Sequence, residues 1–277
     1  MTHERIPLAG VIGNPIAHSR SPQVHGYWLK SLNLRGHYIP MHVTEDNLKD
    51  VLHTLPNVGF VGVNITIPHK EVVLQIADRI SERAKAIGAA NTLFFSADGE
   101  IFADNTDGYG FIENLHQGAR GWDPKVGAAA LLGAGGAARA VICSLLEAEV
   151  PEILISNRTI ERAHALRQEF GPRLRVVEWS QAGSMIAEAN LVVNTTSLGM
   201  VGNSDLNVPL DGLHEGQVVT DLVYNPLETP ILQAARVAGC TTVDGLGMLL
   251  HQAVPGFERW FGQRPEVTPE LRAAAFK

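Results

Sequence analysis

The sequence predicts an α/β protein of two domains. Short apolar and β-branched runs alternate with helical patterns, which is typical of sheets whose strands are joined by right-handed crossovers. A polar stretch with glycine and proline, residues 118–125, separates two such series. A glycine-rich turn at 133–139 then follows a strand of small apolar residues and opens a helix. We therefore expect one domain of residues 1–112 plus 248–277, and a second of residues 113–247.

The composition is typical of a globular protein in a reducing compartment. Of the 277 residues, 45% are hydrophobic and 18% are charged, a balance that suits neither disorder nor a fibre. The net charge of -7 argues against broad binding to nucleic acid. Two cysteines without motif spacing do not suggest a disulfide framework. Because the chain shows no signal-peptide layout and no long apolar stretch, we expect a cytoplasmic protein that binds no membrane.

The first half alternates strands with helices before a hairpin. Ser21 followed by Pro22 is a typical helix start, with Ser21 as the N-cap. The turn Ser96-Ala-Asp98-Gly99 favours a hairpin. The expected strands cover 6–12, 37–43, 59–67, 91–95 and 100–103, and the expected helices cover 22–32, 45–55 and 70–87, with a candidate break near Ser81.

The second half predicts a doubly wound parallel sheet of the Rossmann type, because strand and helix patterns follow each other without hairpin signals. A linking helix over 108–115 precedes it, and a long helix over 247–261 with a short helical tail from 269 follows it. The expected strands cover 126–132, 153–158, 174–178, 191–194 and 218–223, and the clearest helices end at 147 and 170.

The glycine-rich turn matches a dinucleotide fingerprint. Gly133, Gly135 and Ala138 fit the pattern G-x-G-x-x-A, and the turn lies between a strand and a helix with a second strand beyond. Glycine lets the backbone approach a pyrophosphate, whose charge is stabilised by the unpaired N–H groups of the helix N-terminus. A tight strand-to-helix turn without a ligand is the alternative.

The residues after the next strand favour NADP over NAD. NAD enzymes place Asp or Glu about 20 residues after the glycines to accept a hydrogen bond from the ribose 2′-hydroxyl. This chain has Asn157-Arg158-Thr159 there, and Arg162 follows one helical turn later. A carboxylate would repel a 2′-phosphate, whereas guanidinium groups can form charge-assisted bonds to it. The alternative is that both arginines are solvated surface residues.

Lys70 and Asp107 are the candidate catalytic residues. Lys70 follows a β-branched run and Pro68, which places it at a strand-to-helix junction, where open α/β sheets build their sites. Asp107 lies in the turn-prone run Asp104-Asn-Thr-Asp107-Gly108 after another strand. A lysine and an aspartate in one cleft can transfer a proton. The alternative for Lys70 is a surface lysine, although a cation at a helix start opposes the helix dipole.

Further motifs extend over nearly the whole chain. They are Gly13-Asn-Pro-Ile-Ala-His-Ser-Arg-Ser-Pro22, Asn64-Ile-Thr-Ile-Pro-His-Lys70, Gly88-Ala-Ala-Asn-Thr92, Asp104-Asn-Thr-Asp-Gly108, the glycine loop, Asn157-Arg-Thr159, Asn194-Thr-Thr-Ser-Leu-Gly-Met200, Asp221-Leu-Val-Tyr-Asn-Pro226 and Gly245-Leu-Gly-Met-Leu-Leu-His-Gln252. In this order they resemble the shikimate dehydrogenase family. Two departures are Gly26, where the family usually has Asn, and Ile65 for the commoner valine. The resemblance implies NADP-dependent, reversible reduction of 3-dehydroshikimate to shikimate in aromatic amino acid (chorismate) biosynthesis.

The resemblance also implies the roles of individual residues. Shikimate carries one carboxylate and three hydroxyls, so its N-terminal α/β domain must supply anion donors and hydrogen-bonding side chains. Ser19 and Ser21 are implied to bind the carboxylate, Tyr224 to face the substrate, and Lys70 with Asp107 to relay the proton. The remaining implied substrate ligands are Thr66, Asn91 and Gln252. The implied cofactor contacts are Gly133, Ala134, Gly135, Gly136, Ala137, Asn157, Arg158, Thr159, Arg162, Thr195, Ser197, Leu222, Gly245 and Met248.

Several alternatives stay open at this point. Ser21 could serve only as a helix cap, Tyr224 and Met248 could be core residues, and Gln252 could lie on a solvated helix face. Whether lysine or aspartate is the formal base is open, because burial lowers a lysine pKa while a nearby carboxylate raises it. No histidine spacing suggests a metal site.

Two rival functions follow from the same motifs. A quinate or quinate/shikimate dehydrogenase using NAD would be expected to carry an acidic residue at 157 or 158. A catalytically silent NADP-binding regulator would be expected to lack Lys70 or Asp107. The sequence leaves the choice between monomer and homodimer open.

Overall fold

The computed structural model describes residues 6–204 and 206–275 and divides the chain into two compact units. The first unit contains the described residues up to Thr106 and those from Leu250, and the second contains Asp107–Leu249. This division places 107–112 and 248–249 in the second unit, whereas the sequence assigned them to the first domain. The physical reason at 107–112 is close helix packing, since a Cβ on Gly108 would lie 3.1 Å from the Ala140 carbonyl oxygen and the Ser144 Cβ.

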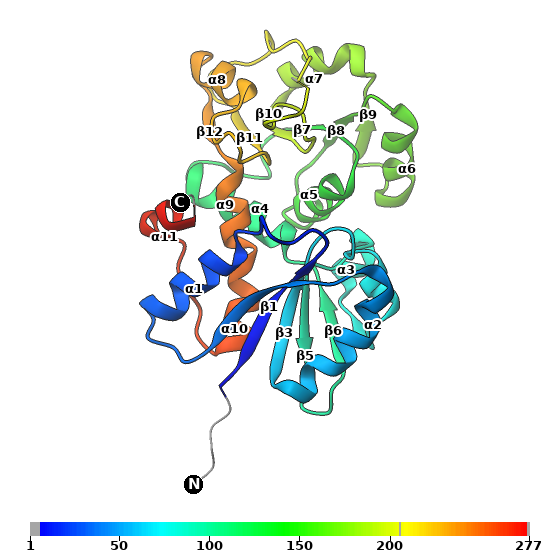
Figure 1. Ribbon diagram of the computed structural model, residues 1–277. Coiled ribbons are helices and arrows are strands. Elements are labelled where there is room, and N and C mark those ends of the chain that lie inside the picture. The colour runs from blue at the N-terminus through cyan, green and yellow to red at the C-terminus, as the bar shows by residue number, and fades with distance from the viewer. Residues whose placement is uncertain (1–5, 205, 276–277) are drawn as a thin grey trace. The chain divides into compact units, whose positions relative to one another are not determined.

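The first unit is built on a six-stranded mixed sheet in the order β2-β1-β3-β5-β6-β4 (Figure 1). Strand β1 pairs in parallel with β2 and β3, whereas β5 is antiparallel to both β3 and β6. The elements are β1 Leu8–Gly13, α1 Ser21–Ser31, β2 His37–His42, α2 Glu45–Thr54, η1 Leu55–Val58, β3 Phe60–Ile65, η2 Val72–Gln75, β4 Arg79–Ile80, α3 Glu82–Ile87, β5 Thr92–Phe95, β6 Ile101–Asp104, α10 Ala253–Phe261 and α11 Pro269–Ala275.

Helices cover both faces of this sheet. Figure 1 shows α1 and α10 on one side and α2 and α3 on the other. The core follows the alternation of side chains along a strand: Val11 packs in a cluster with Trp260 of α10, while Ile12 packs in a cluster with Leu48 of α2. Burial of both faces explains why the central strands read as continuous apolar runs.

The second unit is a parallel sheet in the order β12-β11-β10-β7-β8-β9, which is the Rossmann order 3-2-1-4-5-6 read from its other edge. One face carries α4, α5 and α6, and the other carries α7 and α8. The elements are α4 Asp107–Gly118, β7 Ala128–Leu132, α5 Gly136–Glu147, β8 Ile153–Ser156, α6 Ile160–Phe170, β9 Leu174–Val176, η3 Trp179–Gln181, α7 Ala182–Glu188, β10 Ala189–Asn194, β11 Val218–Asp221, α8 Pro230–Val237, β12 Thr241–Val243 and α9 Gly245–His251.

Two helix predictions were only partly right. The expected break near Ser81 is confirmed, because Ser81 is the N-cap of α3, but residues 70–80 form a turn, the 3-10 helix η2 and the short strand β4 instead of a helix. The interruption arises because the Asp78 carboxylate accepts the N–H of Ile101 and β4 joins β6 in the sheet. The expected helix over 247–261 is likewise divided at Gln252 into α9 and α10, since Pro255 has no N–H to bond to the carbonyl four residues earlier.

None of the helices in the described part of the chain is long and apolar enough to cross a membrane. Strand β12 was not expected from the sequence. The other expected strands are present, with ends that differ by a few residues from those predicted.

We expect opposite effects from alanine at two glycines of the first unit. A Cβ on Gly62 would lie 2.1 Å from the Trp260 Nε1 and 2.2 Å from the Leu93 carbonyl oxygen, two atoms that are themselves hydrogen-bonded at 3.1 Å. Gly62→Ala should therefore lower the free energy of unfolding by about 2–3 kcal/mol. Gly26 lies exposed within α1, and a Cβ added there would have no atom within 4 Å. Gly26→Ala should therefore raise the free energy of unfolding by about 0.5–1 kcal/mol. Urea unfolding of both variants tests this, and equal effects would contradict it.

Candidate functional site

The carboxyl ends of β1 and β3 lie side by side and carry two of the predicted site segments. The N–H of Thr66 donates to the Ile12 carbonyl at 2.9 Å, and the N–H of Asn14 donates to the Ile67 carbonyl at 3.0 Å. These bonds tie the loop that follows β1 to the turn that follows β3. Lys70 lies in that turn, half-buried, and its carbonyl accepts the N–H of Ala90 at 2.8 Å.

Ser21 does not cap α1 as predicted. The cap position is Arg20, and no side chain bonds there, because Ser21 is already the first helical residue. Instead, the Ser19 hydroxyl accepts the N–H of Ser21 at 3.3 Å, and the Ser21 hydroxyl bonds to the hydroxyl of Tyr38. The interpretation of Ser21 as a helix cap alone is therefore wrong.

Tyr38 and Asn64 extend this contact into the sheet. The Tyr38 hydroxyl donates to Asn64 Oδ1 at 2.6 Å, and Asn64 Nδ2 donates to the Asn91 carbonyl and to Thr92 Oγ1, both at 3.1 Å. Burial raises the pKa of Tyr38 well above its ordinary value, and the bond to Ser21 opposes this only in part. Tyr38 is therefore a neutral hydrogen-bonding group at every physiological pH.

The ring of Tyr38 is held in an aromatic cluster. His25 stacks on it with ring centroids 3.8 Å apart and an angle of 3° between the planes. His25 is fully buried, and burial lowers its pKa to about 3, so the imidazole is neutral. His69 is also buried, with its Nε2 2.7 Å from the Val43 carbonyl oxygen. Both histidines are therefore buried side chains with structural positions.

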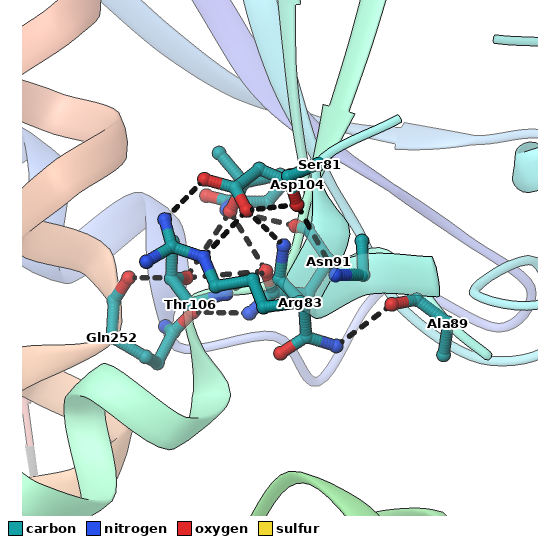
Figure 2. A network of polar contacts seen from close by, with 11 residues as sticks. Ser81, Arg83, Ala89, Asn91, Asp104, Thr106 and Gln252 are labelled. Atoms are coloured by element: carbon teal, nitrogen blue, oxygen red, sulfur yellow. Dashed lines mark hydrogen bonds and ion pairs between the residues drawn. The ribbon is translucent and has the colours of Figure 1, made fainter. Parts of the chain in front are cut away.

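Asn91, Thr106 and Gln252 come together at the centre of a polar network (Figure 2). Asn91 Oδ1 accepts the N–H of Thr106 at 2.9 Å and its hydroxyl at 3.1 Å, while Asn91 Nδ2 donates to Gln252 Oε1 at 3.1 Å. The Thr106 hydroxyl also lies 2.8 Å from the Gln252 carbonyl oxygen. Gln252 therefore does not lie on a purely solvated helix face: it joins the C-terminal segment to the carboxyl edge of the first sheet.

Asp104 is a charged residue of this network at the end of β6. Its carboxylate accepts bonds from Arg83 Nε and the Ser81 hydroxyl, both at 2.7 Å, and from the N–H of Asn105 at 2.8 Å. Burial raises the pKa of Asp104, but the bonds and the positive charge of Arg83 outweigh it, so the pKa lies below its ordinary value. Asp104 is therefore ionised at neutral pH.

Asp107 opens α4 and is the first residue of the second unit, three positions after β6 ends. It is half-buried at the N-terminus of a 12-residue helix, where the helix dipole favours a carboxylate. The sequence motif thus crosses from one unit to the other between Thr106 and Asp107.

The glycine loop lies at the switch point of the parallel sheet, where the strand order reverses between β7 and β10. Gly133 has φ +109°, and a Cβ there would lie 2.7 Å from Thr195 Oγ1, so only glycine fits. Gly135 and Gly136 are exposed, with no atom within 4 Å of their Cβ positions. Ala137 is exposed beside them in the first turn of α5. The N-terminus of α5 is therefore open to an anionic ligand, and the loop fits a dinucleotide phosphate.

Asn157 joins the glycine loop to the end of β8. Its Oδ1 accepts the N–H of Ala134 at 3.2 Å, and its Nδ2 donates to the Thr159 carbonyl at 2.8 Å. Arg158 and Arg162 follow, both exposed at the start of α6. Within residues 6–204 and 206–275, neither arginine forms an ion pair with a carboxylate. Two cations beside the loop fit a ligand with an additional phosphate.

A buried carboxylate organises the ends of β10 and β11. Asp221 accepts bonds from Thr229 Oγ1 at 2.6 Å and from Asn194 Nδ2 and the N–H of Val223 at 2.9 Å. Burial raises the pKa of Asp221, and these three bonds offset the rise only in part. Leu222, which follows Asp221, has its carbonyl oxygen 2.5 Å from the Cβ position of Gly245, so this contact also requires glycine.

The remaining predicted residues lie on the same edge of the second unit. Thr195 is buried and bonds to the Leu132 carbonyl at 2.8 Å, whereas Ser197 is exposed in the loop beyond it. Tyr224 is 37% exposed, so it is not a core tyrosine. Met248 is half-buried and packs against the same core cluster as Leu222.

Sequence reasoning missed several residues of the site. Tyr38, Asn64 and Arg83 received no role, although asparagine in the middle of an apolar strand is a signal that could have identified Asn64. Asp104 and Asp221 were quoted in motifs without a function. Among the residues described, no group of three or more His, Cys, Asp or Glu could hold a metal ion.

Comparisons with known proteins place these features in one family. Three family models match the chain: the shikimate dehydrogenase substrate binding domain at residues 11–93, shikimate/quinate 5-dehydrogenase at 122–207, and the shikimate 5'-dehydrogenase C-terminal domain at 245–274. The chain is 64% identical to a shikimate dehydrogenase (NADP(+)) of Ruegeria sp. over 99% of both chains.

Solved structures agree with this assignment. Shikimate 5-dehydrogenase of Thermus thermophilus, solved with NADP(H) and shikimate, is 39% identical with a TM-score of 0.86, over 97% of this chain and 98% of that one. Quinate dehydrogenase of Corynebacterium glutamicum, solved with NAD, is 32% identical with a TM-score of 0.89, over the same shares of the two chains.

The lowered pKa of Asp104 predicts a pH-dependent contribution to stability. Because the folded-state pKa lies below the unfolded one, ionised Asp104 stabilises the protein above the ordinary value of about 3.9, and this contribution is lost as pH falls through the folded-state pKa. Asp104→Asn should lower the free energy of unfolding by about 1–3 kcal/mol at neutral pH, and the difference from wild type should shrink below about pH 4. Asp98→Asn, in an exposed turn, is the control. A difference independent of pH would contradict the prediction.

Proposed function

The chain belongs to the shikimate dehydrogenase family, and we propose that it catalyses the NADP-dependent, reversible reduction of 3-dehydroshikimate to shikimate. The observation that carries the proposal is the hydrogen-bonded set of Ser21, Asn64, Asn91 and Gln252 at the sheet edge that also carries Lys70. This edge offers many neutral donors and acceptors and one lysine, which suits a polyhydroxylated carboxylate.

In this proposal the first unit binds the substrate. Ser19 and Ser21 bind the carboxylate at the start of α1, where the helix N-terminus favours an anion. Asn91 and Gln252 bind ring hydroxyls, since a carboxamide both donates and accepts. Thr66 supplies a further hydroxyl, and Tyr224 of the second unit supplies another. Because Asn91 Oδ1 is occupied by Thr106, Asn91 presents its Nδ2 as a donor.

The second unit binds NADP. The open N-terminus of α5 takes the pyrophosphate, and Arg158 and Arg162 take the 2′-phosphate. Thr159, Thr195, Ser197, Leu222, Gly245 and Met248 complete this site. When bound, the nicotinamide supplies or accepts the hydride.

Lys70 and Asp107 handle the proton of the reacting hydroxyl. Reduction of the ketone requires a proton donor to the new alkoxide, and oxidation requires a base for the same proton. A protonated lysine is a suitable donor in the first direction. The carboxylate of Asp107 accepts a hydrogen bond from a hydroxyl of the substrate.

Turnover should depend on Lys70 and on the pairing of shikimate with NADP. Assays that follow the reduced nicotinamide, with shikimate or quinate and NADP or NAD in all four pairings, should favour shikimate with NADP. Lys70→Ala should lower kcat by about a hundredfold or more, the usual size of general acid–base catalysis. Lys49→Ala, an exposed lysine of α2, should retain wild-type rates. Preference for quinate or NAD would refute the specificity, and NADP binding without turnover would support a regulator instead.

The two exposed arginines should decide the choice of cofactor. Arg158→Ala and Arg162→Ala should each raise KM for NADP about tenfold, equivalent to about 1.4 kcal/mol, and leave KM for NAD within about twofold, because NAD has no 2′-phosphate. Arg236→Ala, an exposed arginine paired with Glu228, is the matched control. If KM rose equally for both cofactors, these arginines would not be bound to the 2′-phosphate.

A further inference from the structure

The ion pair of Arg83 and Asp104 differs from the other ion pairs between residues of the described chain. The Asp104 side chain is 9% exposed and the Arg83 side chain is 45% exposed, so the pair connects a buried carboxylate to the surface. Both Arg83 Nε and a terminal nitrogen reach the two carboxylate oxygens, which is the bidentate geometry that orients as well as attracts. A buried carboxylate left without such a partner would be strongly destabilised.

Asp104 transmits this orientation to its neighbours through the backbone. Its carboxylate accepts the N–H of Asn105 at 2.8 Å, and its carbonyl accepts the N–H of Asn91 at 3.1 Å. Figure 2 shows Arg83, Asp104, Asn91 and Gln252 joined in one network of polar contacts. Hydrogen bonds to the side chain and to the main chain of Asp104 thus fix the end of β6.

The orientation of the Asn91 carboxamide depends on the same segment. Its oxygen accepts the N–H of Thr106 and the hydroxyl of Thr92, both at 2.9 Å, and rotating the amide would place its N–H groups against the donor N–H of Thr106. The position of Thr106 is set by the Asp104–Asn105 backbone that precedes it. Displacement of Asp104 would therefore leave the Asn91 carboxamide free to rotate. Its Nδ2, which we expect to donate to a substrate hydroxyl, would then lose its fixed position.

We propose that Arg83 is a positioning residue of the substrate site, which acts through Asp104 to hold Asn91 and the Asn105–Thr106 segment. This proposal rests on the proposed function for its substrate, shikimate. It assigns no contact between Arg83 and the substrate. The predicted consequence is a loss of substrate binding without a loss of cofactor binding, because the network lies in the first unit and the NADP contacts lie in the second.

The test is Arg83→Ala with chemical rescue. Removal of a half-exposed side chain opens a path from solvent to Asp104, so millimolar guanidinium chloride, far below denaturing concentrations, can replace the missing group. We expect KM for shikimate to rise about tenfold, a factor equal to about 1.4 kcal/mol, with KM for NADP unchanged, and guanidinium but not equimolar sodium chloride to reverse the loss. Lys85→Ala is the matched control, since Lys85 lies in the same helix and pairs with exposed Glu82.

A second readout does not depend on turnover. Amide hydrogen exchange at Asn105 and Thr106 should be at least about tenfold faster in Arg83→Ala than in wild type, as local opening requires, and guanidinium should slow it again. A variant with lower thermal stability but unchanged KM and unchanged exchange at these two amides would overturn the proposal. If wild type does not turn over shikimate, the proposed function fails, and unchanged exchange would overturn the positioning role independently of that result.

Discussion

Buried polar side chains at the carboxyl edge of a sheet must satisfy one another, and the candidate site is organised by that constraint. Asn64, Asn91, Thr92 and Thr106 are all less than one-tenth exposed. An unsatisfied amide or hydroxyl at such a position would cost about 1–3 kcal/mol. The chain avoids this by joining them into one network that extends from Ser21 through Tyr38 to Gln252. The orientation of each group is therefore determined before any ligand binds.

The second unit meets the same constraint with a different result. The Asn157 side chain accepts a hydrogen bond from the backbone of the glycine loop. Asn194 and Thr229 donate hydrogen bonds to the buried carboxylate of Asp221. These bonds stabilise the backbone of three loops at the switch point of the parallel sheet. The groups that are left open to a ligand are the N–H groups at the start of α5 and two exposed arginines, Arg158 before α6 and Arg162 within it. The first unit thus presents neutral side-chain donors and acceptors to a ligand, whereas the second unit presents backbone N–H groups and cations.

This difference matches the chemistry of the two proposed ligands. A polyhydroxylated ring is recognised by the geometry of many neutral hydrogen bonds, which requires rigid partners. A phosphate is recognised by charge and tolerates long, exposed side chains, since electrostatic attraction depends less on orientation. The burial of Asn91 and the exposure of Arg158 are both consistent with this division of roles.

The sequence by itself determined the fold class, the Rossmann-type half and most of the segments that carry the site. Strand periodicity, proline and glycine positions and the glycine loop are local signals, and they depend on backbone sterics that act over a few residues. The roles of individual residues came from the resemblance of ordered motifs to one family rather than from these signals. The segment before Ser81 and the boundary at Gln252 were harder, because sheet pairing of β4 and the missing N–H of Pro255 interrupt helices that local propensity favours.

Only the tertiary structure decided which polar residues meet. Arg83 and Asp104 are separated by 21 positions, and Asn91 and Gln252 by 161, so no local pattern relates them. The structure also showed that Ser21 bonds to Tyr38 instead of capping its helix. The physical reason is that a hydrogen bond depends on the position and direction of two groups in space. The number of residues between two groups predicts neither their positions nor their directions. Both are fixed only when the sheet forms and the carboxyl ends of its strands come to lie side by side.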